Sequence, residues 1–125
     1  MRQEVGTPAK IEALETMLRA KQALTDGHRW VKTWPNPGQH CALTAINMAA
    51  GNGFNDQPHG TVAECMVLHE VNERRERKKE FTHIPHWNDH WATTKKKVLD
   101  VFNVVINKLY NSLPAKERKK WKDKI

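Results

Sequence analysis

The feature that most constrains the fold is an apolar pattern near the C-terminal end of the chain. Apolar side chains recur there at intervals of three and four residues, at Val98, Val101, Phe102, Val105, Ile106, Leu109 and Tyr110. An α-helix turns once every 3.6 residues, so this spacing places them all on one helical face. Such a face has to be buried against other elements. The pattern therefore predicts a long amphipathic helix, with Thr94 as its N-cap.

Three segments upstream show weaker helical patterns. Residues 8–24 carry apolar side chains at helical spacing, and residues 40–50 are apolar almost all round. Residues 61–71 begin with Thr61-x-x-Glu64, in which a hydroxyl and a carboxylate can each satisfy a backbone N–H group at a helix start. These segments predict three more helices.

Two charged segments follow these helices. The run at 73–80 alternates in sign and is expected to extend the preceding helix into solvent. Pro114 suits the first turn of a short basic helix that carries Trp121. No segment alternates in the manner of a strand. The sequence predicts an all-α fold of four to five helices with a Trp/Pro-rich loop at residues 28–39. It predicts a single small helical domain over residues 1–111 and a basic C-terminal helix or tail over residues 112–125.

Bulk features bear on location. No apolar run approaches the length of about 20 residues that a membrane span needs, and the first residues do not resemble a signal peptide. Cys41 and Cys65 both lie in apolar helical patterns and are expected to be buried, reduced thiols. These features predict a cytoplasmic protein with no membrane partner.

The stretch HIPHWNDHWATTKKKVL at residues 83–99 departs from these simple patterns. Pro85 lacks an N–H group and biases the residue before it toward extended geometry, so residues 83–92 are predicted to be a loop. Lys95, Lys96 and Lys97 then fill a first helical turn, where the helix dipole disfavours positive charge by a few tenths of a kcal/mol per residue. They are either an anion-binding group or lysines that simply reach into water.

The same stretch supplies a second candidate site. Tryptophan faces suit nucleobases and cations, so the candidate ligand-binding residues are Trp34, Trp87, Asn88, Asp89 and Trp91. The alternative is structural, because Asn and Asp side chains bond backbone groups in turns and tryptophans pin loops to a core. The sequence leaves both interpretations open.

The histidines and cysteines complete no known motif. His83, His86, Asp89 and His90 lie close together, but their spacing fits no standard zinc site. Neither cysteine sits in a nucleophile elbow, and no Gly-rich phosphate loop is present. No catalytic residue, metal ligand or cofactor is predicted, and an enzymatic role is left open without being favoured.

Charge gives the clearest indication of a partner. Lys and Arg number 21 against 14 Asp and Glu, a net charge of +7. Six cations and only two acids lie from Ser112 onward. An excess of this kind predicts nucleic acid or an acidic protein surface as partner. The candidate contacts are Lys95, Lys96, Lys97, Arg118, Lys119, Lys120 and Lys122, with Trp121 as a stacking or packing group.

The segments HCALTAI and IPHWNDHWATTKKKVLDVFNVVI resemble the domain of unknown function 6197 family, small uncharacterised proteins of bacteria and their phages. That family carries a Cys-Leu-x-Gly-Ala type helix, then a Trp-Asn-Asp loop, a Thr and a Val-Leu helix. The residues that resemble these blocks are Cys41, Ala42, Leu43 and Ala45 for the first and Trp87, Asn88, Asp89, Thr94, Val98 and Leu99 for the second. The resemblance implies a common helical fold over about residues 14–106, and no activity.

Two departures from the family stand out. The family tends to place acidic residues where this chain has Lys95, Lys96 and Lys97, and the basic segment after Pro114 is an addition. The leading hypothesis is a small cytosolic binding or accessory protein that engages an anionic partner. One form of this hypothesis is that the protein is encoded by a phage. The alternatives are a small-molecule-binding or enzymatic domain that uses Asn88 and Asp89, and a purely protein-binding modulator of a host factor.

Overall fold

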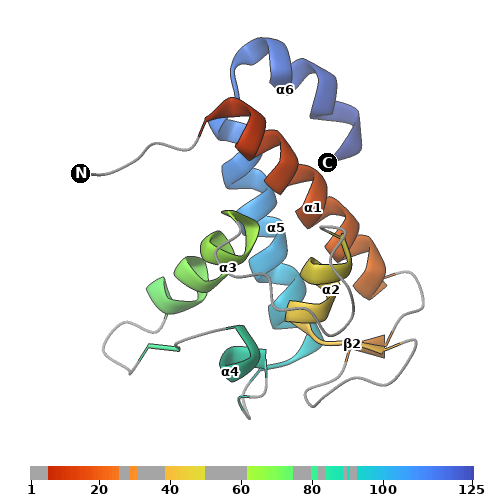
Figure 1. Ribbon diagram of the computed structural model, residues 1–125, viewed down its shortest axis with the longest axis vertical. Coiled ribbons are helices and arrows are strands. Elements are labelled where there is room, and N and C mark those ends of the chain that lie inside the picture. Colours follow the sequence, from red (N-terminus) through yellow and green to blue (C-terminus); the bar gives the residue numbers. More distant parts are fainter. Residues whose placement is uncertain are drawn as a thin grey trace.

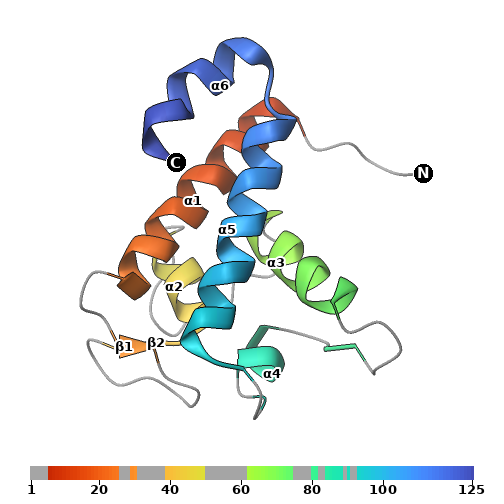
Figure 2. The same cartoon turned by 180° about the vertical axis from the view of Figure 1, so that it is seen from behind.

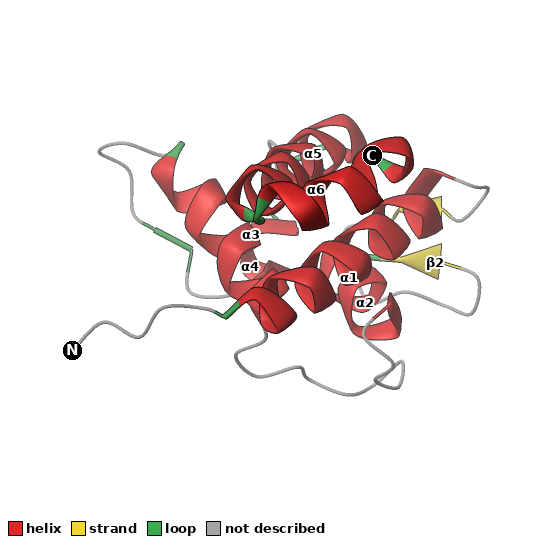
Figure 3. Ribbon diagram, turned by 90° about the horizontal axis from the view of Figure 1, so that it is seen from above, coloured by secondary structure: helices red, strands yellow, loops and turns green. Residues whose placement is uncertain are grey.

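The structure is a computed structural model that describes residues 6–25, 29–30, 39–49, 62–74, 80–81, 84–88, 90 and 93–125. The helices are α1 (Thr7–Thr25), α2 (Ala42–Ala49), α3 (Val62–Glu73), α4 (Ile84–Asn88), α5 (Lys95–Ser112), α6 (Ala115–Trp121) and the 3-10 helix η1 (Lys122–Lys124). Two-residue strands, β1 (Arg29–Trp30) and β2 (Gln39–His40), pair in parallel, with Trp30 opposite His40. Figure 3 shows how small this pair is beside the helices. The all-α prediction is confirmed.

The two longest helices form the centre of the molecule. α1 packs against α2 and α5, and α3 packs against α5 and α1. α4 lies beside the start of α5, whereas α6 lies at the opposite end (Figure 1). α5 therefore connects two ends of the molecule that carry different parts of the sequence.

The predicted apolar faces make the core. α5 buries the face that its periodicity predicts, except that Tyr110 is only half-buried, and α1 buries a matching stripe. The largest fully buried side chains are Phe102, Leu14, Met17, Leu24, Ile46, Ile84, Ile106, Leu109, Val67, Val98 and Val105. These residues come from five of the six α-helices in the described part of the chain, so these helices depend on one another for stability.

Thr94 begins α5 as predicted. It has extended backbone angles of φ −123° and ψ 165°, and its side chain accepts a hydrogen bond from the backbone N–H of Lys97 at 3.3 Å. At the other end, the backbone N–H of Leu113 donates to the carbonyl oxygen of Tyr110 at 3.1 Å. The helix thus starts immediately after the N-cap, and Lys95 to Lys97 occupy its first turn.

The prediction of a loop over residues 83–92 is wrong for Ile84–Asn88, which form α4. Pro85 is the second residue of α4. The N–H groups of a first helical turn have no partner within the helix, so a proline there loses nothing. Residues 83, 89, 91 and 92 lie outside the described part of the chain.

Two predictions about α3 are also corrected. Cys65 is exposed, while Cys41 is buried, and both are free thiols. Ala63 and Val67, one turn apart, belong to the buried face of α3. Cys65 lies midway between them and therefore points to the other side of the helix. The helix ends at Glu73, the first residue of the charged run, and Arg74 lies in a turn. Residues 75–79, like Thr61, lie outside the described residues.

None of the described helices has the length and hydropathy of a bilayer-spanning helix. The described part of the chain also contains no group of three or more His, Cys, Asp and Glu side chains able to hold a metal ion.

Candidate anion-binding surface

The basic end of the chain folds back as α6 and η1. Pro114 precedes α6, and its carbonyl oxygen accepts hydrogen bonds from the backbone N–H groups of Glu117 at 2.9 Å and Arg118 at 3.0 Å. A helix of seven residues is too short to be stable alone in water. Leu113 is buried, and Trp121 packs, partly buried, against the core. These two apolar residues hold α6 at its two ends.

The two faces of α6 differ sharply in chemistry. Glu117, Arg118 and Trp121 are half-buried, so they form the inward face. Lys116, Lys119 and Lys120 are exposed, and their spacing of three and four residues puts them on one side of the helix. We call these three residues the α6 lysine face. Lys122, the first residue of η1, is exposed beside it.

Little of the positive charge on this face is neutralised. Lys120 Nζ lies 3.6 Å from the Oε1 of Glu117, a surface pair that is worth little. Among the described residues, Lys116 and Lys119 make no ion pair. Lys119 and Lys120 belong to the last turn of α6, where the helix dipole favours positive charge. The dipole of α6 therefore favours the charges of Lys119 and Lys120, whereas Lys116 lies in the first turn, where it does not.

The second predicted basic group, Lys95 to Lys97, lies elsewhere. All three are exposed at the start of α5. α5 has 18 residues, which at 1.5 Å per residue separates its ends by about 27 Å. Figure 2 shows α6 at the end of α5 opposite to this group. The structure does not bring the two predicted anion-binding groups together.

The Trp-Asn segment makes contacts inside the protein. Asn88 is 0% exposed. Its Oδ1 accepts hydrogen bonds from Trp30 Nε1 at 2.7 Å and from the backbone N–H of Ala42 at 2.9 Å. The hydroxyl of Thr93 donates to the carbonyl oxygen of Trp87, which is itself buried, at 2.7 Å. These contacts support a structural role for Asn88 and Trp87.

The rest of that candidate site cannot be placed. Trp34, Asp89 and Trp91 lie outside the described residues. A ligand-binding role for these residues with Trp87 and Asn88 stays a prediction. What the structure adds is that the side-chain oxygen of Asn88, the atom best suited to accept from a ligand, is already used by two donors.

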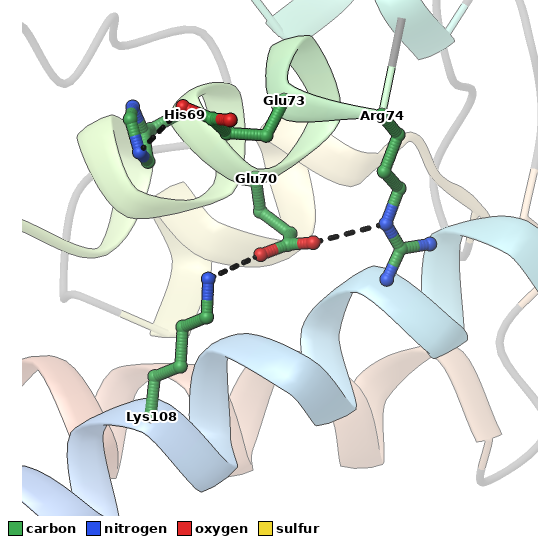
Figure 4. Close-up of polar contacts among 5 residues, drawn as sticks. All are labelled: His69, Glu70, Glu73, Arg74 and Lys108. Carbon is green, nitrogen blue, oxygen red and sulfur yellow. Dashed lines mark hydrogen bonds and ion pairs between the residues drawn. The ribbon is translucent and has the colours of Figure 1, made fainter. Parts of the chain in front are cut away.

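A cluster that sequence reasoning did not single out joins α3 to α5 (Figure 4). Glu70 Oε1 lies 2.6 Å from Lys108 Nζ, and Glu70 Oε2 lies 3.0 Å from Arg74 Nε. Burial acts to raise the pKa of Glu70, but the hydrogen bonds and charges of Lys108 and Arg74 outweigh it and hold that pKa below its ordinary value. The spacing of Glu70 and Arg74 was visible in the sequence, whereas Lys108 lies 38 residues away.

Comparison with known proteins finds a family whose sequence model matches the chain. Residues 8–108 match the sequence model of a family of unknown function, DUF6197. The chain belongs to this family. No curated protein and no solved structure matches it significantly.

The DUF6197 match divides the basic residues into two sets. It includes Lys95 to Lys97, and it ends within α5, before α6 begins. The α6 lysine face is thus a feature of this chain beyond the part that matches DUF6197. Since no function is established for DUF6197, the chemistry of the surface has to indicate the partner.

Proposed function

We propose that the protein is a non-catalytic, cytoplasmic binding protein that engages nucleic acid through the α6 lysine face. The observation that carries this proposal is the arrangement of Lys116, Lys119 and Lys120 on the exposed side of a helix whose other side packs on the protein. Because α6 is packed against the core through Trp121, its lysines project from a fixed backbone. They can therefore contact several regularly spaced phosphates at once.

The energetics favour a polyanion over a single small anion. An exposed lysine is a hydrated point charge, and one such contact contributes little by itself. A polymer of phosphates carries condensed counterions, and each phosphate that a lysine neutralises releases some of them. Several lysines on one face therefore act together on nucleic acid, and affinity falls steeply as salt rises.

Lys95 to Lys97 have a secondary role in this proposal. They lie at the end of α5 away from α6, and the two ends of α5 are about 27 Å apart. Their position at the start of a helix works against their positive charge. They add to the overall attraction between the protein and a polyanion, which acts over a longer range than direct contact.

Binding measurements on two triple variants test the proposal. Lys116, Lys119 and Lys120 are changed to Glu in one variant, and Lys95, Lys96 and Lys97 in the other, so that both have the same net charge. Fluorescence anisotropy follows binding to labelled duplex DNA and RNA at low salt. We expect the α6 variant to lose on the order of 100-fold in affinity and the α5 variant clearly less.

Two results would contradict the proposal. The first is a wild-type protein that binds neither DNA nor RNA at low ionic strength. The second is an equal loss in the two variants, which would show that net charge alone attracts nucleic acid. Polyglutamate serves as an acidic protein surface in a competition assay, and preferential binding to it would assign the partner to protein instead.

A further inference from the structure

We infer that the α6 lysine face reads the phosphate backbone of a double-stranded nucleic acid, without regard to base identity. The inference rests on the proposed function and specifies its substrate. It follows from what α6 and η1 offer to a nucleic acid and what they do not.

Base stacking is the usual means of holding single strands, and it needs an accessible aromatic face. Trp121 is the one aromatic residue from Ser112 to the end of the chain. Its side chain packs on the core and is half-buried. Lys124 Nζ lies over its ring, 4.8 Å from the centroid. The ring is therefore engaged on the protein side and by this ammonium group, and α6 has no stacking platform to offer.

Two other tryptophans that the structure describes are engaged as well. Trp30 packs against the core and donates from its indole nitrogen to Asn88 at 2.7 Å. Trp87 is only 5% exposed. These rings serve the core, so neither of them supplies a nucleobase platform.

Sequence readout in a groove needs side chains that make paired hydrogen bonds to base edges. Arg with guanine and Asn or Gln with adenine are the common pairs. The exposed charged side chains of α6 are all lysines, whereas its arginine, Arg118, is half-buried on the inward face. Lysine lacks the rigid fork of arginine and acts as a point charge. The exposed chemistry of α6 thus matches phosphates and provides little base discrimination.

A duplex is the form of nucleic acid that suits such a surface best. Double-stranded DNA presents one negative charge per about 1.7 Å of its axis, about twice the density of one strand. Lys116 and Lys120 are one helical turn apart, about 6 Å along the axis of α6. Closely spaced phosphates can meet these lysines together without any unstacking of bases.

Three measurements on the full-length protein test the inference. Affinity is measured for duplexes that differ in base composition and for their separated strands. We expect the duplex affinities to agree within about threefold, because even one specific base contact would separate them by about fivefold or more. We also expect duplexes to bind more tightly than single strands. The slope of log affinity against log salt is expected near −3, for three neutralised phosphates.

Tryptophan fluorescence supplies the third measurement. Stacking of a base on Trp121 would quench its emission, which is isolated by comparison with a Trp121→Phe variant. We expect nucleic acid to change the emission of the wild type and of the Trp121→Phe variant to the same extent, because no base stacks on Trp121. Sequence preference, tighter binding of single strands or quenching at Trp121 would each overturn the inference while leaving nucleic-acid binding intact. Absence of all binding at low salt would instead reject the proposed function.

Discussion

Trp30 and Asn88 are joined by a 2.7 Å hydrogen bond across 58 residues of sequence. The same Asn88 oxygen also accepts from the backbone N–H of Ala42, at the first residue of α2. One buried amide therefore ties β1, α2 and α4 together. In the structure, Asn88 of the Trp87-Asn88 motif thus links three elements by hydrogen bonds.

Replacing Asn88 by Ala should destabilise the protein by about 2–4 kcal/mol. The substitution leaves two buried or half-buried donors without their acceptor, and each unsatisfied donor costs about 1–3 kcal/mol. Urea unfolding followed by circular dichroism measures the change. Trp30→Phe is the control, since it removes one donor and should cost less than Asn88→Ala. A stability loss below about 0.5 kcal/mol for Asn88→Ala would mean that this oxygen is not a structural joint.

Glu70→Gln should reduce stability at neutral pH by about 1 kcal/mol. The figure is small because the side chains of Lys108 and Arg74 are 54% and 43% exposed, so water screens both pairs. Glu73→Gln is the matched control on the same helix. Glu73 pairs with His69 at the surface, and its loss should change the free energy of unfolding by less than about 0.5 kcal/mol.

The stability of the wild-type protein should depend on pH through Glu70. The pKa of Glu70 is lower in the folded chain than its ordinary value, so the ionised carboxylate stabilises the fold above the unfolded-state pKa. This contribution is lost as the pH falls from about 5 through the folded-state pKa. Over this range the free energy of unfolding should fall more steeply with decreasing pH for the wild type than for Glu70→Gln. Parallel curves would show that this carboxylate does not contribute.

Changing Lys95 and Lys96 to Glu should raise stability by about 0.5–1.5 kcal/mol. Both are exposed in the first turn of α5, where the helix dipole favours negative charge. Thermal unfolding at low salt, repeated at high salt, measures the gain and its screening. Thr94→Ala in the same assay should lower stability by about 0.5–1 kcal/mol, because it removes the N-cap acceptor of Lys97. A double variant less stable than wild type would indicate that these lysines make stabilising contacts.

Ending the chain after Leu113 should leave the rest of the protein folded. No residue of α6 or η1 is buried, and the main apolar contribution of this segment is the half-buried Trp121. We expect a cooperative transition with a loss of about 1–2 kcal/mol. Circular dichroism and urea unfolding of the truncated protein provide the measurement, and they also test the predicted division near residue 112. Loss of cooperative unfolding would show that α6 is integral to the core.

The fold was predictable where the sequence pattern is local. The periodicity of Val98 to Leu109 defines the buried face of α5, and Thr94 marks its start. Local rules were less successful where two of them compete. Pro85 disfavours a helix interior but is compatible with a first turn, and α4 takes the second option.

The candidate site was predictable in composition and less so in geometry. The charge of the last residues follows from the sequence. The candidate contacts chosen from it included Arg118, which lies on the inward face of α6, and omitted Lys116, which lies on the exposed side. Which side of the helix faces outward depends on the packing of Trp121, which the sequence left open. The contacts of Glu70 with Lys108 and of Asn88 with Trp30 could not be predicted. The two residues of each contact lie 38 and 58 positions apart in the sequence. Contacts between residues so far apart are determined by the packing of whole helices.

The attachment of α6 has a consequence for how proteins of this kind can diversify. Leu113 follows α5 and is buried in the core, and no residue of α6 or η1 is buried. A different terminal segment could be spliced in at Pro114 to give a chimaera with an intact interior and a new binding preference. Under the proposed function, exchange at this junction would change the binding surface and leave the buried residues unchanged.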